Sequence, residues 1–126
     1  MKLHESGEDY LEAMLVMQLK NGYIRSLDVA EYLNVKKPSV SRATKLLTEG
    51  GFITMDEDKH IHFTDLGRET AERVYERHRI LTQALIALGV EAEAAELDAC
   101  RIEHDISEDT FEKLKRHLEH FLQNQK

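Results

Sequence analysis

The sequence predicts a mainly α-helical protein, for three reasons. Apolar residues recur at the three- and four-residue spacing of helix faces over most of the chain. The 126 residues include one proline and six glycines, so few positions interrupt a helix. Only two short stretches, 52–55 and 60–63, alternate in the manner of strands, and the polar turn 56–59 joins them into a hairpin. A hydrophobic content of 41% is enough for one compact domain or two small domains that share a core.

Three helices are expected before this hairpin. The first ends at Asn21–Gly22, and the second runs from Ser26, its expected N-cap, to Asn34. The third opens at Pro38, because proline is favoured in a first helical turn, and it stops at Gly50–Gly51. The inward positions expected from the apolar spacing are Leu11, Met14, Leu15, Leu19, Val29, Ala30, Leu33, Val40, Ala43, Leu46 and Leu47.

Three more helices are expected after the hairpin. Thr64 caps a long helix that reaches Leu88, the segment 91–105 forms the next helix, and Ser107 caps the last one. The inward positions expected here are Val74, His78, Leu81, Leu85, Leu88, Phe111, Leu114, Leu118, Phe121 and Leu122. No linker rich in proline, glycine or serine separates the two halves of the chain, so they meet in the long helix.

Two short helices followed by a hairpin are typical of a winged helix-turn-helix, in which the second helix enters the DNA major groove. The net charge of −7 argues against a nucleic-acid partner, yet the window 36–45 holds four cations and no acid. A charged helix pair is often merely a solvated surface, but the basic window and the hairpin after it favour DNA binding. His60 and His62 share a face of the second strand and can meet a phosphate or water. The expected DNA-facing residues are Lys36, Lys37, Pro38, Ser39, Ser41, Arg42 and Lys45.

Metal-binding side chains recur at helical spacing in three segments. Cys100, Glu103 and His104 share one face if 91–105 is helical, and Glu96 lies a turn earlier. The other candidates are Asp9 and Glu12 on the first helix and His78 on the long helix. Such donors suit a first-row divalent ion, with the oxygens favouring Mn(II) or Fe(II). Each residue also has an ordinary structural explanation, such as a small buried thiol or carboxylates at the positive end of a helix.

The segments that carry these residues resemble one family. VAEYLNVKKPSVSRATKLL, YERHRIL and DACRIEHDIS are similar in order and content to the diphtheria toxin repressor family of metal-dependent transcriptional regulators. The resemblance covers nearly the whole chain, and ACRxEH with an upstream RHRxL is fairly specific. In length the chain is similar to the manganese transport regulator branch, without the SH3-like domain of many iron-responsive members.

The resemblance implies a homodimeric repressor with a winged helix-turn-helix domain, 1–70, and a helical dimerisation and metal-binding domain, 71–126. The first domain would bind a palindromic operator in double-stranded DNA. The positions that match metal ligands of the manganese branch are Asp9, Glu12, His78, Glu103 and His104. Cys100 stands where that branch has glutamate and the iron-responsive branch has cysteine, and Glu96 stands where iron-responsive members have a histidine ligand. The implied site is a hybrid, for Mn(II) or Fe(II), with one or two ions per subunit.

The resemblance also implies that metal binding switches DNA binding on, because the implied metal ligands come from both expected domains. An ion shared by Asp9, Glu12 and the later ligands would hold the two recognition helices of a dimer about 34 Å apart, the spacing of successive major grooves. Two other functions stay open: a regulator that answers to a small organic ligand or to oxidation of Cys100, and a metalloenzyme. An enzyme is not expected, because the ligands are numerous enough to fill the coordination shell.

The cellular location expected from the sequence is the cytoplasm. No apolar stretch approaches the roughly 20 residues of a membrane span, and the N-terminal residues lack a signal-peptide core. The single cysteine would stay reduced there.

Overall fold

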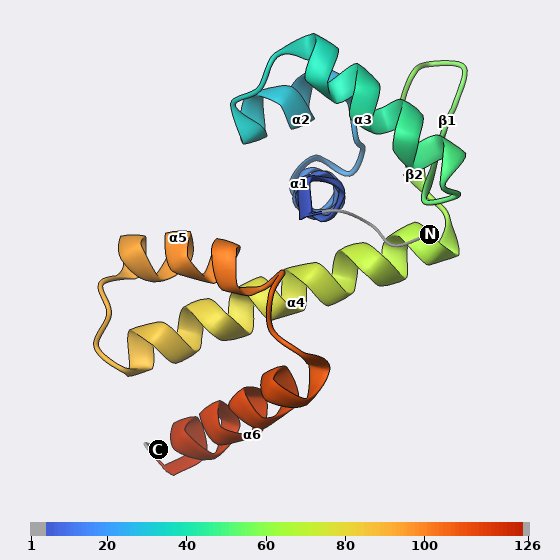
Figure 1. The fold of residues 1–126 in the computed structure, drawn as a ribbon. Helices are drawn as coiled ribbons and strands as arrows, with labels where there is room; N and C mark the ends of the chain where they lie inside the picture. Colours follow the sequence, from blue (N-terminus) through green and yellow to red (C-terminus); the bar gives the residue numbers. More distant parts are fainter. Residues whose placement is uncertain (1–4, 125–126) are drawn as a thin grey trace. The chain divides into compact units, whose positions relative to one another are not determined.

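The computed structural model describes residues 5–124, which form six helices and one hairpin (Figure 1). The elements in chain order are α1 (Glu5–Asn21), α2 (Ser26–Leu33), α3 (Lys37–Glu49), β1 (Ile53–Met55), β2 (Ile61–Phe63), α4 (Asp65–Ala87), α5 (Ala92–Ile102) and α6 (Glu108–Asn124). The predicted mainly α-helical class is confirmed. The chain divides into two compact units, Met1–Val74 and Tyr75–Lys126, and the division lies within the continuous helix α4.

The first unit contains the predicted helix-turn-helix, formed by α2 and α3 (Figure 1). Asn34 ends α2 in the left-handed conformation, with φ of 56°, which asparagine tolerates better than most residues. Val35 N donates to Ala30 O over 3.0 Å and closes the turn. Lys36 then adopts an extended conformation and caps α3, whose first turn contains Pro38. These local preferences set the short connection between the two helices.

The hairpin after α3 is antiparallel, with Ile53 opposite Phe63 and Met55 opposite Ile61. Its turn closes with Asp56 N donating to His60 O over 3.0 Å, and Lys59 adopts a φ of 64°. The strands are shorter than expected by one residue each, since Phe52 and His60 lie outside the ladder. The predicted wing therefore follows the recognition helix directly.

The first unit has a core of fully buried side chains from α1, α2, α3 and both strands. They are Leu11, Met14, Ile24, Val29, Val40, Leu47, Ile53 and Ile61. Two inward positions predicted for this unit are wrong: Leu19 is 67% exposed and Leu46 is 60% exposed. Leu19 lies in the last turn of α1, and Leu46 lies beside the buried Leu47 on the solvent side of α3. The predicted N-cap of α2 is also wrong, because Arg25 occupies that position and Ser26 begins the helix.

The second unit consists of the C-terminal half of α4 with α5 and α6. Its buried apolar side chains are Leu81, Ala95, Ala99, Phe111 and Leu118. The predicted caps of α4 and α6 are confirmed: Gly67 N donates to Thr64 Oγ1 in the first unit, and Thr110 N donates to Ser107 Oγ in the second unit, each over 3.1 Å. The helix predicted over 91–105 is shorter and ends at Ile102.

The apolar residues at the end of α4 and on α6 are more exposed than their helical spacing predicts. Leu88 lies beyond the end of α4 and is 81% exposed, so its inward assignment is wrong. Three positions of α6 also reach the surface, namely Leu114, Phe121 and Leu122. Among the described residues, no helix is long and apolar enough to cross a bilayer.

Candidate functional site

The recognition helix α3 presents its basic residues to solvent. Its buried face is formed by Val40, Thr44 and Leu47. The exposed residues of the basic window are Lys36, Lys37, Pro38, Ser41, Arg42 and Lys45, and Ser39 is half-buried. The structure thus brings six of the seven expected DNA-facing residues onto an open surface, as a helix that enters a groove requires.

The cations of α3 differ from the arginines at the base of the same unit. Arg68 pairs with Glu72 over 3.4 Å, and Arg73 pairs with Glu8 over 3.4 Å. Within residues 5–124, no carboxylate lies within ion-pair distance of Lys36, Lys37, Arg42 or Lys45. In a chain of net charge −7, such uncompensated positive charge is available to an external anion.

The wing carries a hydrogen-bonded group centred on Asp56. Its Oδ1 accepts from the backbone N–H groups of Asp58 and His60, each over 2.9 Å. Its Oδ2 lies 2.7 Å from His62 Nε2 and 4.0 Å from His60 Nδ1. The hydrogen bond to the His62 side chain is the largest of the effects that lower the pKa of Asp56 below its ordinary value of 3.8. The two histidines therefore share one carboxylate, which orders the tip of the hairpin.

The second unit contains a buried carboxylate between two imidazoles. The Glu103 side chain is 0% exposed, its Oε2 lies 2.9 Å from His78 Nδ1, and its Oε1 lies 3.4 Å from His104 Nε2. The His104 side chain is 3% exposed. α5 ends at Ile102, but Glu103, its C-cap residue, keeps a helical conformation, and its N–H donates to Ala99 O over 3.0 Å. Glu103 therefore still lies about one turn after Cys100, and it meets His78 of α4 from the end of α5.

Two further candidates lie close to this group. Glu96 Oε1 on α5 is 3.9 Å from His78 Nε2, although its side chain is 71% exposed. Cys100 is half-buried on the last turn of α5, with its Sγ within 4.8 Å of a Glu103 carboxylate oxygen. Asp9 and Glu12 belong to the first unit, where both are half-buried and lie about one turn apart on α1.

Arg77 is a residue that the sequence reasoning did not single out for any role. It is buried, and its Nη1 donates to the carbonyl oxygens of Glu103 and Ile106, each over 3.1 Å. Its Nη2 donates to Glu108 Oε2 over 2.6 Å, and its guanidinium lies 5.3 Å from the centre of the Phe111 ring. The sequence carried little signal for this role, because Arg77 lies between Glu76 and Arg79 in a charged stretch of α4. Arg77 fixes the turn that carries Glu103 and His104.

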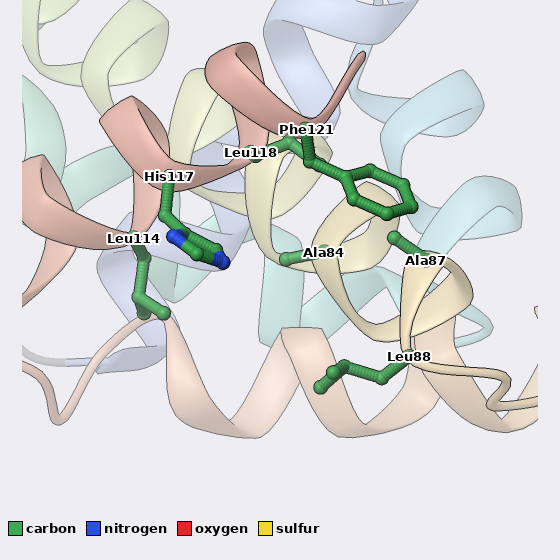
Figure 2. Close-up of a pocket in the computed structure, with 7 residues that line it drawn as sticks. All are labelled: Ala84, Ala87, Leu88, Leu114, His117, Leu118 and Phe121. Carbon is green, nitrogen blue, oxygen red and sulfur yellow. The ribbon is translucent and has the colours of Figure 1, made fainter. Parts of the chain in front are cut away.

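The second unit also has an apolar pocket of about 150 Å³, shown in Figure 2. Helices α4 and α6 and the residue that follows α4 line it, through Ala84, Ala87, Leu88, Leu114, His117, Leu118 and Phe121. One imidazole among six apolar side chains is a poor set of metal ligands. The pocket is therefore apolar surface rather than a second ion site.

The group around Glu103 fits a divalent cation. A carboxylate without access to solvent is costly unless positive charge compensates it. Glu103 Oε1 accepts no hydrogen bond within the described part of the chain, and each of its oxygens faces an imidazole nitrogen. Neutral imidazole and carboxylate are ligands of first-row divalent ions. The donor set and the buried oxygen are both those of a metal site.

Two family models together match nearly the whole chain. The N-terminal DNA-binding domain of iron-dependent repressors matches residues 2–61, and the metal-binding and dimerisation domain of the same repressors matches residues 64–126. The chain belongs to the iron-dependent repressor family. It is a metal-dependent, DNA-binding transcriptional repressor and not an enzyme, as predicted.

Individual members of the iron-dependent repressor family match over most of this chain. An uncharacterised HTH-type transcriptional regulator of Methanocaldococcus jannaschii is 31% identical over 121 residues, which cover 94% of this chain and 97% of that protein. The transcriptional regulator MntR of Salmonella typhimurium is 34% identical over 105 residues, which cover 83% of this chain and 67% of MntR. The solved manganese regulator SloR is 26% identical, with a TM-score of 0.80, over 94% of this chain and 55% of SloR. The chain thus spans about half the length of SloR.

Proposed function

We propose that this protein represses genes of metal uptake or homeostasis when Mn(II) or Fe(II) is bound in its second unit. The observation that carries the proposal is the buried carboxylate of Glu103, held between the imidazoles of His78 and His104. A bound ion would supply positive charge to this buried carboxylate. The carboxylate oxygens of Glu96 and Glu103 favour Mn(II) or Fe(II), whereas the sulfur of Cys100 favours softer first-row divalent ions. SloR, a manganese regulator, supports the same choice.

The proposed ligands are the seven residues predicted from the sequence. His78, Cys100, Glu103 and His104 would hold the ion in the second unit, with Glu96 at its solvent side. Asp9 and Glu12 on α1 would complete the set from the DNA-binding half. Seven ligands are enough for one ion, which takes about four to six, and two ions per subunit would need a bridging carboxylate or water in addition.

The switch follows from the placement of the ligands along the chain. Asp9 and Glu12 are carboxylates on α1, whose buried face packs in the core beneath α2 and α3. If a shared ion fixed α1 to the second unit, α3 would be fixed as well, because both helices pack in the same core. An allosteric coupling of about 1–3 kcal/mol would change operator affinity by roughly 5- to 150-fold.

The proposed partners are double-stranded DNA and a second copy of the chain. A homodimer with two α3 helices matches a palindromic operator whose half-sites are about 34 Å apart. The apolar surface of the second unit supports self-association, since Leu88 and Leu97 are 81% and 64% exposed. The proposed location is the cytoplasm.

The test measures operator binding by fluorescence anisotropy with Mn(II), Fe(II), Zn(II) or chelator, on DNA from upstream of a metal-transporter gene. The wild-type protein is expected to bind tightly only with metal. His78→Ala and Cys100→Ala should each weaken the metal-dependent binding while the fold is retained by circular dichroism. His120→Ala is the matched control, because His120 is exposed on α6 outside the Glu103 group.

Equilibrium dialysis of the same variants separates metal binding from DNA binding. An unchanged metal response in both His78→Ala and Cys100→Ala would overturn the ligand assignment. Binding to DNA that responds to peroxide or to a small organic ligand, but not to any divalent ion, would overturn the metal-dependent function.

A further inference from the structure

Arg25 lies where the chain enters the helix-turn-helix, and two contacts order its exposed side chain. Its Nε donates to His60 Nε2 over 3.4 Å, and its guanidinium carbon lies 4.8 Å from the centre of the Tyr23 ring. The rings of Tyr23 and His60 are themselves 5.5 Å apart. The guanidinium is therefore stacked on one ring and hydrogen-bonded to another, which restricts its rotamers before any ligand binds.

The backbone fixes these side chains to the wing. Arg25 and His60 form an isolated antiparallel bridge, and Ile61 N donates to Ile24 O over 2.9 Å. Ile24 and Ile61 are both fully buried. The segment 23–25 is thus attached to the edge of β2, and Arg25 connects the N-terminus of α2 to the wing.

Arg25 resembles the cations of the window 36–45 in that its positive charge is not neutralised by an ion pair within the described part of the chain. Among the residues that the structure describes, no carboxylate forms an ion pair with its guanidinium. Arg68 and Arg73, in the same unit, each pair with a glutamate. The Nε–H of Arg25 is used on His60, but an arginine that is ordered, exposed and not neutralised keeps its four Nη–H donors for an external anion.

We propose that Arg25, positioned by Tyr23 and His60, binds a phosphate of the DNA backbone and extends the DNA interface from α3 to the base of the wing. The inference rests on the proposed DNA-binding function. In a helix-turn-helix the first helix crosses the DNA backbone, and Arg25 caps that helix. A contact with phosphate positions the protein without selecting a sequence.

The test measures binding of the full-length, Mn(II)-loaded protein to fluorescein-labelled duplex DNA as a function of salt. A mixed-sequence duplex is sufficient, because phosphate contacts act on any sequence. Arg25→Ala should reduce the slope of log K against log salt by about 1 and weaken binding about tenfold at low salt. Arg68→Ala is the matched control, since its guanidinium is already paired, and it should leave the slope unchanged.

Two further variants distinguish the phosphate contact from a folding effect. Arg25→Lys should restore the salt slope, because the charge is kept, with weaker binding, because lysine lacks the planar fork. Tyr23→Leu should weaken binding less than Arg25→Ala, with circular dichroism unchanged, because it removes only the stacking partner.

The outcomes separate this inference from the proposed function. If Arg25→Ala keeps the wild-type slope while Arg42→Ala lowers it, α3 binds DNA and Arg25 does not, so the inference is wrong. If neither substitution changes the slope and the wild-type protein ignores DNA, the proposed function itself fails.

Discussion

The two functional regions of this protein differ in how their charged groups relate to the core. On α3 the cations are exposed, and a separate face with Val40 and Leu47 makes the packing contacts. Around Glu103 the functional carboxylate is itself buried, and Arg77 holds the backbone that carries it. Substitutions on α3 should therefore change DNA affinity with little loss of stability, whereas substitutions around Glu103 should change both. The predictions below test this difference.

The largest effect is expected from Arg77→Ala in the second unit. The substitution removes two hydrogen bonds to backbone carbonyls and the ion pair with Glu108. The Glu108 side chain is 64% exposed and is solvated without Arg77, but the two carbonyl acceptors lose their donor, which costs about 1–3 kcal/mol for each one that is buried. Urea denaturation followed by circular dichroism measures the free energy of unfolding, and metal affinity should fall in the same variant because the turn with Glu103 loosens.

Arg79→Ala is the control for this prediction. Arg79 is exposed two residues further along α4 and contacts the Tyr75 ring, with 5.8 Å from its guanidinium carbon to the ring centre. Its loss should change stability by less than about 0.5 kcal/mol. Equal unfolding free energies for the two variants would show that Arg77 does not stabilise the turn.

A smaller loss of stability is expected from Gly67→Ala. This variant tests whether the first unit is as sensitive to a buried substitution as the second unit. A Cβ at Gly67 would lie 1.8 Å from the carbonyl oxygen of Phe52, so the start of α4 and the hairpin must separate. Overpacking of this kind costs about 1–3 kcal/mol. Thermal unfolding of Gly67→Ala and of the exposed control Glu69→Ala gives the comparison, and identical melting temperatures would contradict the close contact.

The smallest effect is expected at the wing, from Asp56→Asn. The lowered pKa of Asp56 means that its ionised form is stabilised in the folded protein. That contribution is present above the ordinary pKa of 3.8 and is lost as the pH falls through the lower, folded-state pKa. The variant should melt slightly below the wild type at neutral pH, and the difference should vanish in strong acid. A difference that grows in acid would contradict the stabilisation of the ionised Asp56 carboxylate.

Local sequence signals predicted the first unit well because its elements are bounded by residues with strong conformational preferences. Asn34, Pro38 and Gly50 are examples, and the helix ends lie close to the expected positions. The errors at Leu19 and Leu46 arose where an apolar residue lies at the edge of a helix face. Periodicity alone does not decide there whether a neighbouring element covers the side chain.

The helix predicted over 91–105, which was expected to carry three of the metal-site candidates, is shorter than its spacing indicated. It ends at Ile102, but Glu103 keeps a helical conformation as the C-cap residue and still lies about one turn after Cys100. The contact between Glu103 and His78 depends on tertiary packing, and Arg77 stabilises the chain from Glu103 to Ile106. A helix end depends on its tertiary hydrogen bonds, so the sequence carried only a weak signal of it.

The amino-acid sequence by itself determined the order of the elements, the basic surface of α3 and the set of candidate metal ligands. These properties follow from local preferences and from charge, which neighbouring residues along the chain decide. The tertiary structure decided which imidazoles face Glu103, which arginines are neutralised and how Arg25 meets His60. Those contacts join residues about 25 to 35 positions apart, and only the packing of the core brings them together.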